Sequence, residues 1–414
     1  MSRLQELIQK LCPDGVEYKA LEEIGAFFGG LTGKSKDDFK DGNAKFITYR
    51  NVYSNPSLNL DIKDKVKIAD NEKQHVIRYG DILFTGSSET PDECGMSSVV
   101  ATPTNEKLYL NSFCFGLRLY DMTAFDIHYL KHILRSSDIR EQIRKTASGV
   151  TRYNVSKKRF AKIYIPIPPI EVQTEISRIL DAFTFYAAEL QAELQARKEQ
   201  YAYYRDQLLT FDEHAEGVEW KKLGEIGTFT RGNGLQKKDF TDVGIGCIHY
   251  GQIYTYYGTS ASQIKTHVNS ELARKLAKVN TGNLVIACTS ENIDDVCKAV
   301  VWLGNEEIVT GGHACVFSHN EEPKYIAYFF QTSSFDQQKK KYARGTKVID
   351  IKTSDLEKIL IPIPSLSEQQ RIVSILDKFE ALVNDLTVGL PAEIAAVQEQ
   401  YEYYRNKLLS FPRK

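Results

Sequence analysis

Two short polar loops, each containing a glycine, hold side chains suited to gripping an anion. They occupy residues 147–154 (ASGVTRYN) and 343–347 (ARGTK). Arginine and lysine attract phosphate oxygens, and hydroxyl and amide groups donate hydrogen bonds to them. The candidate contacts in these loops are Ser148, Thr151, Arg152, Asn154, Arg344, Thr346 and Lys347. The alternative interpretation is that each loop is a solvated turn at the end of a helix.

The charge around the two loops supports the first interpretation. Residues 131–162 contain ten Lys or Arg against Asp138 and Glu141, and residues 324–358 contain eight against four acids. The whole chain, in contrast, carries a net charge of −1, which is not the overall basicity of a simple nucleic-acid-binding protein. Local basic faces on a neutral chain therefore indicate an anionic ligand together with a protein partner.

A second group of polar residues follows short strand-like runs. At base edges arginine suits guanine, and asparagine or glutamine suits adenine. These candidates are Tyr49, Arg50, Asn51, Ser87, Ser88, Tyr250, Gln252, Thr289, Ser290 and Asn292. Loop cations that precede them are Lys34, Lys36, Arg231, Lys237 and Lys238. The alternative for both sets is ordinary solvated surface.

Three motifs resemble catalytic or metal sites, but each departs from the pattern that such a site requires. Residues 29–35 (GGLTGKS) resemble a phosphate-binding loop, but the position that must be glycine, five residues before the Gly-Lys pair, is Phe28. A nuclease-like carboxylate set around residues 322–324 has a proline at its centre. His313 and Cys315 lack metal-ligand spacing. We therefore predict no catalytic residue and no metal ligand in this chain.

An internal repeat sets the architecture that must position these residues. Residues 161–211 and 357–411 share an Ile-Pro-Ile-Pro stretch, which recurs after 196 residues, and a Tyr-x-Tyr-Tyr-Arg block, which recurs after 200. The four extra residues correspond to about one helical turn. Residues 15–19 and 80–83 also recur, at 217–221 and 282–285, so the chain is one module of about 200 residues written twice.

The repeated segments predict two long helices. Apolar and aromatic residues recur at steps of three and four, as in a coiled-coil seam. The seam and partner-interface positions are Ile176, Ile179, Phe183, Leu190, Tyr201, Tyr204, Ile372, Leu376, Phe379, Leu386, Tyr401 and Tyr404. Connectivity makes the pair antiparallel, and Gly389 and Pro391 predict a break in the second helix. We also expect the two chain termini to meet.

The predicted fold class is α+β: two similar globular domains, called arms here, separated by a long antiparallel two-helix coiled coil with pseudo-two-fold internal symmetry. In each arm we expect short strands, such as residues 45–52 and 284–289, and a late amphipathic helix at residues 127–144 or 325–342. The expected divisions are an N-terminal helical segment (1–12), arm one (13–165), a central helical region (166–214), arm two (215–361) and a C-terminal helical region (362–414).

Composition limits the class of protein. The chain has 414 residues, of which 42% are hydrophobic and 26% charged, as in a soluble globular protein. We expect no transmembrane helix, because no apolar run approaches ~18–20 residues. Seven cysteines at irregular spacing indicate reduced thiols and a cytoplasmic location.

The doubled elements, taken together, resemble the specificity subunit of type I restriction–modification systems. The residues that carry the resemblance are the Ile-Pro hinges (165–168, 361–364), the Gln-containing helix starts (171–175, 368–370), the ILD-F runs (179–183, 375–379), the Gln-Tyr-x-Tyr-Tyr-Arg blocks and residues 12–17 (CPDGVE). The resemblance implies two target recognition domains that each read half of a split DNA sequence. It also implies helices that dock two methyltransferase subunits, which an endonuclease subunit joins.

The leading hypothesis is thus a non-catalytic subunit that recognises double-stranded DNA. By the same resemblance the chain binds no cofactor, and S-adenosylmethionine, ATP and Mg²⁺ belong to its partner subunits. One alternative is a self-sufficient nuclease or methyltransferase with fused recognition domains, and a second is a protein scaffold that does not bind DNA. The sequence gives neither the target, nor the half-site of each arm, nor the length of the unread gap.

Overall fold

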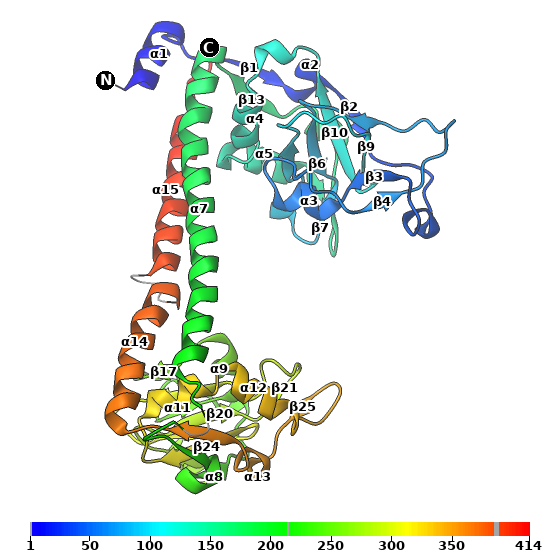
Figure 1. The fold of residues 1–414 in the computed structure, drawn as a ribbon. Coiled ribbons are helices and arrows are strands. Elements are labelled where there is room, and N and C mark those ends of the chain that lie inside the picture. The colour runs from blue at the N-terminus through cyan, green and yellow to red at the C-terminus, as the bar shows by residue number, and fades with distance from the viewer. Residues whose placement is uncertain (1, 213–214, 385–388) are drawn as a thin grey trace. The chain divides into compact units, whose positions relative to one another are not determined.

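The chain forms two compact units in a computed structural model that describes residues 2–212, 215–384 and 389–414 (Figure 1). The first unit contains Met1–Gln191 and Glu393–Lys414, and the second contains Ala192–Ala392. Each unit joins an arm of mixed strands and short helices to part of the long helical segments. The described helices all lack the combination of length and apolarity that crossing a bilayer requires.

Two four-stranded sheets form the framework of the first arm, in the orders β2-β10-β6-β8 and β4-β3-β9-β5. Strand β6 is buried along its whole length, as expected for a continuous apolar run in the interior of a sheet. The strands of these sheets are β2 (Gly25–Gly29), β3 (Ala44–Ile47), β4 (Lys65–Val66), β5 (Val76–Ile77), β6 (Ile82–Thr85), β8 (Ser97–Val99), β9 (Leu108–Leu110) and β10 (Cys114–Leu119). Two smaller sheets contain β1 (Glu17–Ala20) with β13 (Tyr164–Ile167), and β7 (Ser87–Ser88) with β11 (Ala147–Ser148) and β12 (Tyr153–Val155).

The second arm repeats this plan with one strand added to the first sheet and one strand fewer in the small hairpin sheet. Its larger sheets have the orders β15-β24-β20-β22-β17 and β18-β16-β23-β19. Their strands are β15 (Gly227–Arg231), β16 (Ile245–Ile248), β17 (Ser260–Ala261), β18 (Thr266–Val268), β19 (Ala277–Val279), β20 (Leu284–Ala287), β22 (Ala299–Trp302), β23 (Ile308–Thr310) and β24 (Ala314–His319). The two-stranded sheets contain β14 (Glu219–Lys222) with β26 (Leu360–Ile363), and β21 (Thr289–Ser290) with β25 (Ile349–Asp350).

Short helices cover the sheets, and three longer ones follow the arms. The first arm carries α1 (Arg3–Leu11), α2 (Leu21–Ile24), η1 (Lys36–Phe39), α3 (Tyr49–Ser54), η2 (Pro91–Glu93), η3 (Met122–Ala124), α4 (Ile127–Ile133), α5 (Ser137–Thr146) and α6 (Lys157–Phe160). The second carries α8 (Leu223–Ile226), η4 (Lys237–Asp239), α9 (Tyr250–Thr255), α10 (Ser270–Ala273), α11 (Pro323–Phe329), α12 (Ser333–Lys340) and α13 (Thr353–Leu356). The long helices are α7 (Ile170–Leu208), α14 (Leu366–Asn384) and α15 (Leu390–Leu408).

The predicted single helix late in each arm is wrong, because each arm has two helices there. In the first arm the Ser136 hydroxyl donates to the Ile133 carbonyl oxygen at 2.7 Å, and in the second the Thr332 hydroxyl donates to that of Phe329 at 2.8 Å. A hydroxyl that takes a carbonyl of the last turn competes with continuation of the helix. The predicted strand at residues 45–52 also ends early, at Ile47, because Thr48 caps the N-terminus of α3.

The Ile-Pro-Ile-Pro stretches, which the sequence predicts to be extended hinges, form paired strands. Strand β13 pairs with β1, and β26 pairs with β14. A buried tyrosine from the arm fixes each one: the Tyr129 hydroxyl donates to the Pro166 carbonyl oxygen at 3.1 Å, and the Tyr325 hydroxyl donates to that of Pro362 at 2.8 Å. The sequence repeat is therefore also a repeat of tertiary hydrogen bonds.

The predicted seam residues pack within each unit. In the first unit Phe183 of α7 stacks on Tyr404 of α15, and in the second unit Tyr204 of α7 stacks on Phe379 of α14. Ile176, Ile179 and Tyr401 join the core of the first unit, and Tyr201, Ile372 and Leu376 join that of the second. Both cores also contain residues of the arm, so arm and helix share one core. Leu190 is buried, and Leu386 lies outside the described residues.

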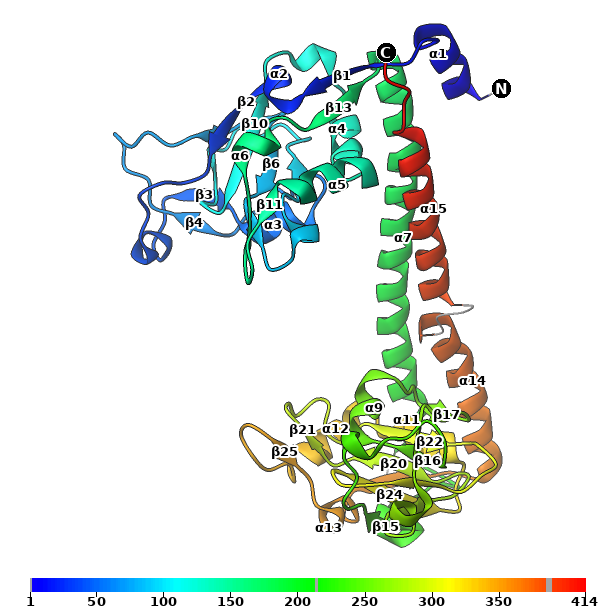
Figure 2. The ribbon, with the colours of Figure 1, turned by 180° about the vertical axis from the view of Figure 1, so that it is seen from behind.

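The start of the first arm contacts the C-terminal residues in the first unit, and both chain ends lie near the same end of α7 (Figure 2). The Val16 amide donates to the Pro412 carbonyl oxygen, and the Lys414 amide donates to that of Val16, both at 3.0 Å. The Tyr18 hydroxyl donates to the Phe411 carbonyl oxygen at 2.8 Å. The predicted break at Gly389 and Pro391 adjoins residues 385–388, which lie outside the described residues; α14 is described as far as Asn384, and α15 begins at Leu390.

Candidate nucleic-acid interface

In the first arm a small three-stranded sheet brings together candidate residues from distant parts of the chain. Strand β12 pairs with β7, which places Asn154 opposite Ser87, and with β11, which places it opposite Ser148. The Arg152 guanidinium donates to the Ser87 hydroxyl oxygen at 3.0 Å, and the Tyr49 hydroxyl donates to the Ser87 carbonyl oxygen at 2.7 Å. Three candidate segments thus form one surface feature.

The β11–β12 hairpin presents its tip to solvent. Gly149 has a φ of +154°, and a Cβ there would meet the Arg152 carbonyl oxygen at 2.0 Å, so the turn requires glycine. Val150, at the tip, is 89% exposed, and Thr151 and Arg152 are exposed beside it. The Arg152 guanidinium lies 5.1 Å from the ring centroid of Phe113, a cation–π contact.

Phe113 and Val150 are surface residues that the sequence analysis missed. Phe113 is 55% exposed. The sequence does not reveal this exposure, because an aromatic residue in a loop belongs to no periodic pattern. An exposed ring can stack on a base or pack on a sugar. The one sequence signal is the position of Val150 between Gly149 and a Thr-Arg pair.

The second arm has a related hairpin leading into β25. The Arg344 amide donates to the Asp350 carbonyl oxygen at 3.1 Å, and the Asp350 amide donates back at 2.8 Å. Gly345 has a φ of +111°, and a Cβ there would meet the Val348 carbonyl oxygen at 2.0 Å. Arg231 of β15 donates to the Asp350 carboxylate at 3.0 Å. The structure therefore gathers Arg231, Arg344 and the exposed Thr346 and Lys347 around one loop.

The two arms use different tyrosines to hydrogen-bond the corresponding strands β7 and β21 of their hairpin sheets. In the first arm Tyr49 makes the bond to β7, but in the second arm the Tyr254 hydroxyl donates to the Thr289 carbonyl oxygen of β21 at 2.8 Å. Tyr254 is the repeat counterpart of Tyr53, not of Tyr49. Tyr250, the counterpart of Tyr49, instead packs its ring against His249 and His313. Burial raises the pKa of both Tyr49 and Tyr254, so both hydroxyls keep their protons.

Several sequence candidates are occupied by bonds within the chain. Lys34 pairs with Glu72, and its side chain is 8% exposed. The Asn51 amide donates to the Asn59 carbonyl oxygen at 2.8 Å and accepts from the Asn59 amide at 3.2 Å, so it shapes its own loop. The Gln252 side chain donates to the Thr266 hydroxyl at 3.1 Å and caps α9, and Asn292 donates to Asp295 at 2.7 Å.

The remaining candidates divide between buried and exposed positions. Ser87 and Ser88 are buried, and the Ser88 hydroxyl donates to Glu93 at 3.2 Å. Ser290 is half-buried in β21. Arg50, Lys36, Lys237 and Lys238 are exposed. Within the described residues no carboxylate or carbonyl binds the Arg50 side chain, so it is free to contact a ligand.

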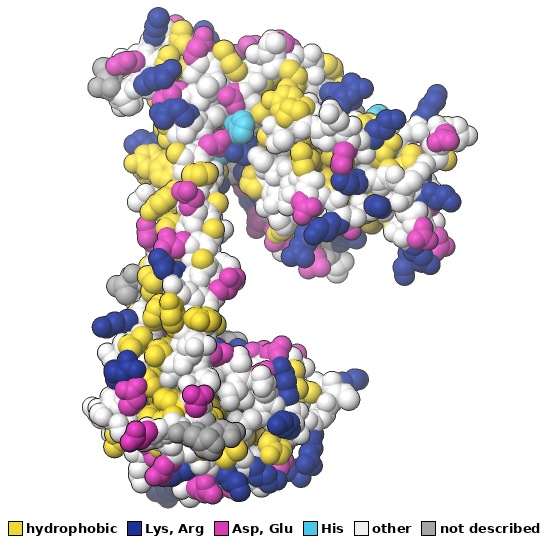
Figure 3. Space-filling view, in the orientation of Figure 1, with side chains coloured by type: hydrophobic (Ala, Val, Ile, Leu, Met, Phe, Trp, Pro, Cys, Tyr) yellow, Lys and Arg dark blue, Asp and Glu magenta, His cyan; other side chains and the backbone are white. Residues whose placement is uncertain are grey.

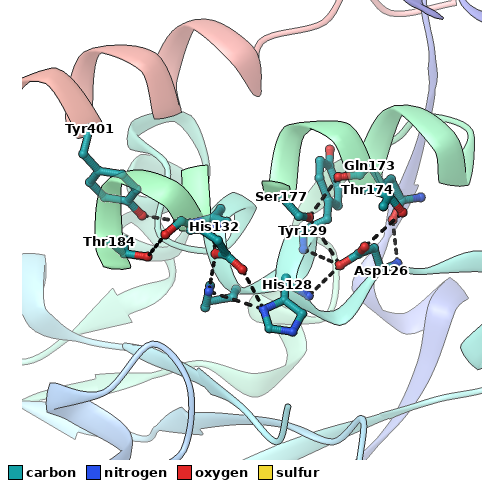
Figure 4. A network of polar contacts seen from close by, with 11 residues as sticks. Asp126, His128, Tyr129, His132, Gln173, Thr174, Ser177, Thr184 and Tyr401 are labelled. Atoms are coloured by element: carbon teal, nitrogen blue, oxygen red, sulfur yellow. Dashed lines mark hydrogen bonds and ion pairs between the residues drawn. The ribbon is translucent and has the colours of Figure 1, made fainter. Parts of the chain in front are cut away.

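A polar junction fixes the first arm to α7. Asp181 of α7 accepts from His132 at 2.6 Å, lies 2.9 Å from Nδ1 of His128 and forms an ion pair with Lys131. Asp126 caps α4 and accepts from Thr174 of α7 at 3.0 Å (Figure 4). Burial opposes ionisation of Asp181, but the bonds from His128, His132 and Lys131 hold the pKa of this carboxyl well below its usual range. The arm that contains the β11–β12 hairpin is thus fixed to α7 by these polar contacts.

The long helices carry exposed aromatic rings of their own. Phe185 is 65% exposed, Tyr203 60% and Tyr403 58%, and hydrophobic side chains follow the helices in the space-filling view (Figure 3). Tyr203 and Tyr403 are repeat counterparts, and each ring packs edge-on against the next tyrosine. The described residues contain no cluster of His, Cys, Asp and Glu able to hold a metal ion.

The duplicated fold and its two hairpin surfaces can be compared with families of known sequence. The sequence profile of the family described as "Type I restriction modification DNA specificity domain" matches residues 13–199 and 215–396. These two matches cover most of the chain and follow the internal repeat. The chain therefore belongs to this family and contains two copies of its domain.

Individual relatives agree with the family. The chain is 37% identical over 267 residues to the type I restriction enzyme EcoR124I/EcoR124II specificity subunit of Escherichia coli, covering 63% of this chain and 65% of that protein. It is 33% identical over 282 residues to a putative type I restriction enzyme specificity subunit of Haemophilus influenzae, covering 64% of this chain and 68% of that protein. The matched part is thus close to two thirds of each relative.

A solved structure shares the fold over the whole length of the chain. It is a chain from a structure reported for the complex assembly and conformational transition of the type I R-M system. The TM-score is 0.65 at 17% sequence identity, and the alignment covers 96% of this chain and 98% of the other.

Proposed function

We propose that this chain is the non-catalytic DNA-recognition subunit of a type I restriction–modification complex. Each arm reads one half of an asymmetric bipartite target in double-stranded DNA, and the bases between the halves are not read. The observation that carries the proposal is the pair of exposed cationic hairpins on a repeated frame. The frame keeps its hinge, buried tyrosine and long helix in both units, whereas the hairpin loops differ in sequence.

Different residues perform different parts of the recognition. Arg152, Arg344 and Lys347 lie on the hairpin loops, where they contact phosphates and set the position of the arm without reading sequence. Arg50 is exposed at the start of α3 and reads a base edge, for which guanine is the best partner. Unlike arms on a repeated frame read unlike half-sites, by the same logic that relates symmetric proteins to palindromic sites.

The helices carry the rest of the proposed function. They form an antiparallel two-helix coiled coil that spaces the two target recognition domains and sets the length of the gap. The ring stacks between Phe183 and Tyr404 and between Tyr204 and Phe379 support this pairing. The exposed Tyr203 and Tyr403, in counterpart positions, are contacts for two copies of one methyltransferase subunit.

The partners supply the chemistry in this proposal. An endonuclease subunit completes the complex, and S-adenosylmethionine, ATP and Mg²⁺ bind to the partner subunits. The complex works in the cytoplasm, which suits a chain with seven free cysteines, all buried.

Selection from a randomised pool of DNA duplexes tests the proposal. The chain, purified together with its methyltransferase, should enrich a two-part motif with a gap of fixed length. Fluorescence anisotropy on the selected duplex should then show affinity that falls steeply with salt, because phosphate contacts release counterions. Binding that is negligible at every salt concentration would instead favour a protein scaffold. Cleavage or methylation by the chain alone would favour the fused enzyme.

A further inference from the structure

The first unit holds a partly buried arginine, Arg135, whose place in the second unit is taken by a different residue type. Arg135 follows α4, and its guanidinium donates to the carbonyl oxygens of Ser97 at 2.5 Å, Tyr53 at 3.1 Å and Val52 at 3.4 Å. Burial is the main cause that lowers its pKa to about 10, and the nearby Arg140 lowers it further. The carbonyls of α3 and β8 thus form a socket that binds a guanidinium group.

The repeat places Gln331 at the corresponding position of the second unit. Tyr129 and Tyr325 are counterparts, because both donate to a hinge carbonyl, and Arg135 and Gln331 each follow six residues later. The Gln331 side chain does not turn toward the carbonyls but donates to the Thr259 hydroxyl at 2.9 Å. The residue that takes the place of Arg135 therefore brings no guanidinium to the carbonyls in this unit, and Arg205, which lines the cavity from α7, is paired with Asp206.

In the second unit a cavity of about 570 Å³ lies beside Gln331, at the place that corresponds to the Arg135 guanidinium of the first unit. Its lining includes Ile253, Tyr254 and Ala299, the counterparts of Val52, Tyr53 and Ser97. In the described residues no N–H group donates to the carbonyl oxygens of Ile253 and Tyr254, which lie in the last turn of α9. The carbonyl end of a helix favours a cation.

The cavity also gains a carboxylate that the first unit lacks. Asp181 and Asp377 are counterparts at the junction with the long helix, and three residues after them stand Thr184 in the first unit and Glu380 in the second. Glu380 lines the cavity, and no Lys, Arg or His lies within ion-pair distance of it in the described part of the chain. At these two positions the second unit has a neutral amide and an anion in place of a cation and a neutral hydroxyl. The cations that also line the cavity have other carboxylates as ion-pair partners: Arg205 with Asp206, Lys298 with Asp295 and Lys339 with Asp336.

The Glu380 carboxylate has hydrogen-bond partners, but both are neutral hydroxyl groups, so its charge is not balanced. The Thr259 hydroxyl donates to Oε1, and the Tyr328 hydroxyl lies 2.9 Å from Oε2. The same hydroxyl lies 2.5 Å from the Asp377 carboxylate. Because a tyrosine has one hydroxyl hydrogen, it can serve only one of the two carboxylates at a time. Asp377 also has Lys324 at 2.9 Å, which leaves Glu380 as the carboxylate without a charged partner.

A neighbouring exchange shows that the chain can compensate for such a loss. Arg140 donates to the carbonyl oxygens of Asp92 and Cys94, both at 2.6 Å, and its counterpart in the second unit is Asp336. There Lys339, one helical turn later, donates to the counterpart carbonyls of Asp294 at 2.8 Å and Val296 at 3.1 Å. No residue in the described chain makes the corresponding replacement for Arg135.

We infer that the cavity of the second unit is a binding site for a guanidinium group. Glu380 pairs with its charge, and the carbonyls of Ile253 and Tyr254 accept its N–H groups. The group comes either from a small free molecule or from an arginine of a docking subunit. The second source rests on the proposed function, because Arg205 of α7 and Asn384 of α14 also line the cavity and belong to the helices assigned to docking.

Isothermal titration calorimetry of the full-length chain with agmatine, a small guanidinium compound, tests the inference without DNA or partners. Agmatine should bind with a stoichiometry of one and more tightly than putrescine, because the planar fork suits carbonyl acceptors. Glu380→Gln should weaken binding at least about tenfold, which corresponds to ~1.4 kcal/mol. Gln331→Arg should abolish binding, because the chain then fills its own socket. No binding to the wild-type chain, or unchanged binding to both variants, would overturn the inference.

A second measurement covers the case in which a variant folds poorly. Arg135→Gln empties the socket of the first unit, so it should lower the melting temperature, and agmatine should recover part of the loss for this variant. Gln331→Arg should raise the melting temperature. A loss in Arg135→Gln that agmatine leaves unchanged, or a fall for Gln331→Arg, would count against the socket.

Assembly with the methyltransferase separates the two sources. If a partner arginine fills the cavity, Gln331→Arg weakens assembly and agmatine competes with it. If a free molecule fills the cavity, assembly is unchanged and only agmatine binding is lost. DNA recognition by the arms is measured separately, so a failure of this inference leaves the proposed function standing.

Discussion

The imidazole Nδ1 of His132 lies 2.9 Å from the hydroxyl oxygen of Tyr401, which joins the first arm to the helix near the C-terminus (Figure 4). The other ring nitrogen faces Asp181 at 2.6 Å. In the second unit Tyr328 stands in place of His132 and does not titrate near neutral pH, because burial and the carboxylates of Glu380 and Asp377 raise its pKa. His132 can therefore take up a proton in mild acid, whereas Tyr328, in the same place of the second unit, cannot.

Stability of the first unit should fall as the pH drops below about 6.5. Burial lowers the pKa of His132 from 6.5, although Asp181 opposes this shift. The unfolded chain therefore binds the proton more readily, so stability rises with pH through this window and is lost below it. The slope from one such group is at most about 1.4 kcal/mol per pH unit. Below a pH of about 4 protonation of Asp181, whose folded pKa is depressed, removes a further contribution.

Scanning calorimetry from pH 7 to pH 5 measures this effect. His132→Gln should flatten the dependence of the melting temperature on pH, and His75→Gln, at an exposed position, should leave it unchanged. Equal slopes in the wild-type chain and in His132→Gln would show that this junction does not sense pH.

Replacement of a buried glutamine at either hinge should destabilise its unit. Gln369 donates to the Pro364 carbonyl oxygen at 2.9 Å and accepts from the Glu322 amide at 3.0 Å. Gln369→Ala leaves both buried groups unsatisfied, which costs about 1–3 kcal/mol for each. Thermal unfolding gives the change, with Gln370→Ala as the exposed neighbouring control. Equal effects of the two substitutions would refute this role.

Lys339 should hold the loop that follows β21 in place. Lys339→Met keeps the length of the side chain but removes its bonds to Asp294 and Val296. Hydrogen exchange should become faster in residues 291–297 with little change elsewhere. Lys340→Met, at the exposed position next along the helix, should have no such effect. Unchanged exchange in Lys339→Met would mean that other contacts fix the loop.

Arg152→Ala should weaken DNA binding to a similar extent for every sequence. Its guanidinium lies on the exposed hairpin, and loss of one phosphate contact should reduce the slope of log affinity against log salt by about 1. Anisotropy at several salt concentrations gives that slope. Arg178→Ala, which removes an exposed arginine paired with Glu175 on α7, is the matched control. A change in sequence preference without a change in slope would assign Arg152 to base reading instead.

Arg50→Ala should relax sequence preference in one half-site and leave the other unchanged. A bidentate contact between arginine and guanine is worth about 1–3 kcal/mol of discrimination. Asn51, which the sequence suggested for this role, is less suited to it because its amide is bonded to Asn59. Selection from randomised duplexes with each variant gives the preference by position. A uniform loss across both halves would contradict the role assigned to Arg50.

The frame was predictable because it is written twice. The Ile-Pro pairs, the helix starts with Gln173 and Gln369, and the contact of the first arm with the C-terminal residues follow from matching residues at fixed offsets. Long helices also carry a periodic signal that survives in a single sequence. What the repeat did not give was the role of each matched residue: Gln173 and Gln369 fix the hinges by hydrogen bonds to Pro168 and Pro364.

The candidate contacts were less predictable, because exposure and internal hydrogen bonding decide them. Arg152 and Asn51 are both polar loop residues in the sequence, yet one is presented on a hairpin and the other holds its own loop. The cavity beside Glu380 depends on an exchange between Arg135 and Gln331 that becomes visible only when their surroundings are compared. Phe113 became a candidate only through its contact with Arg152.

Mapping of methylated bases across the genome, in strains with and without this gene, tests the central claim most directly. We predict methylation that depends on the gene and occurs at one asymmetric two-part sequence with a gap of constant length. A strain that carries Arg50→Ala should lose preference in one part only. Methylation that does not depend on the gene, or a single continuous motif, would contradict an account in which two unlike arms each read their own half of the site.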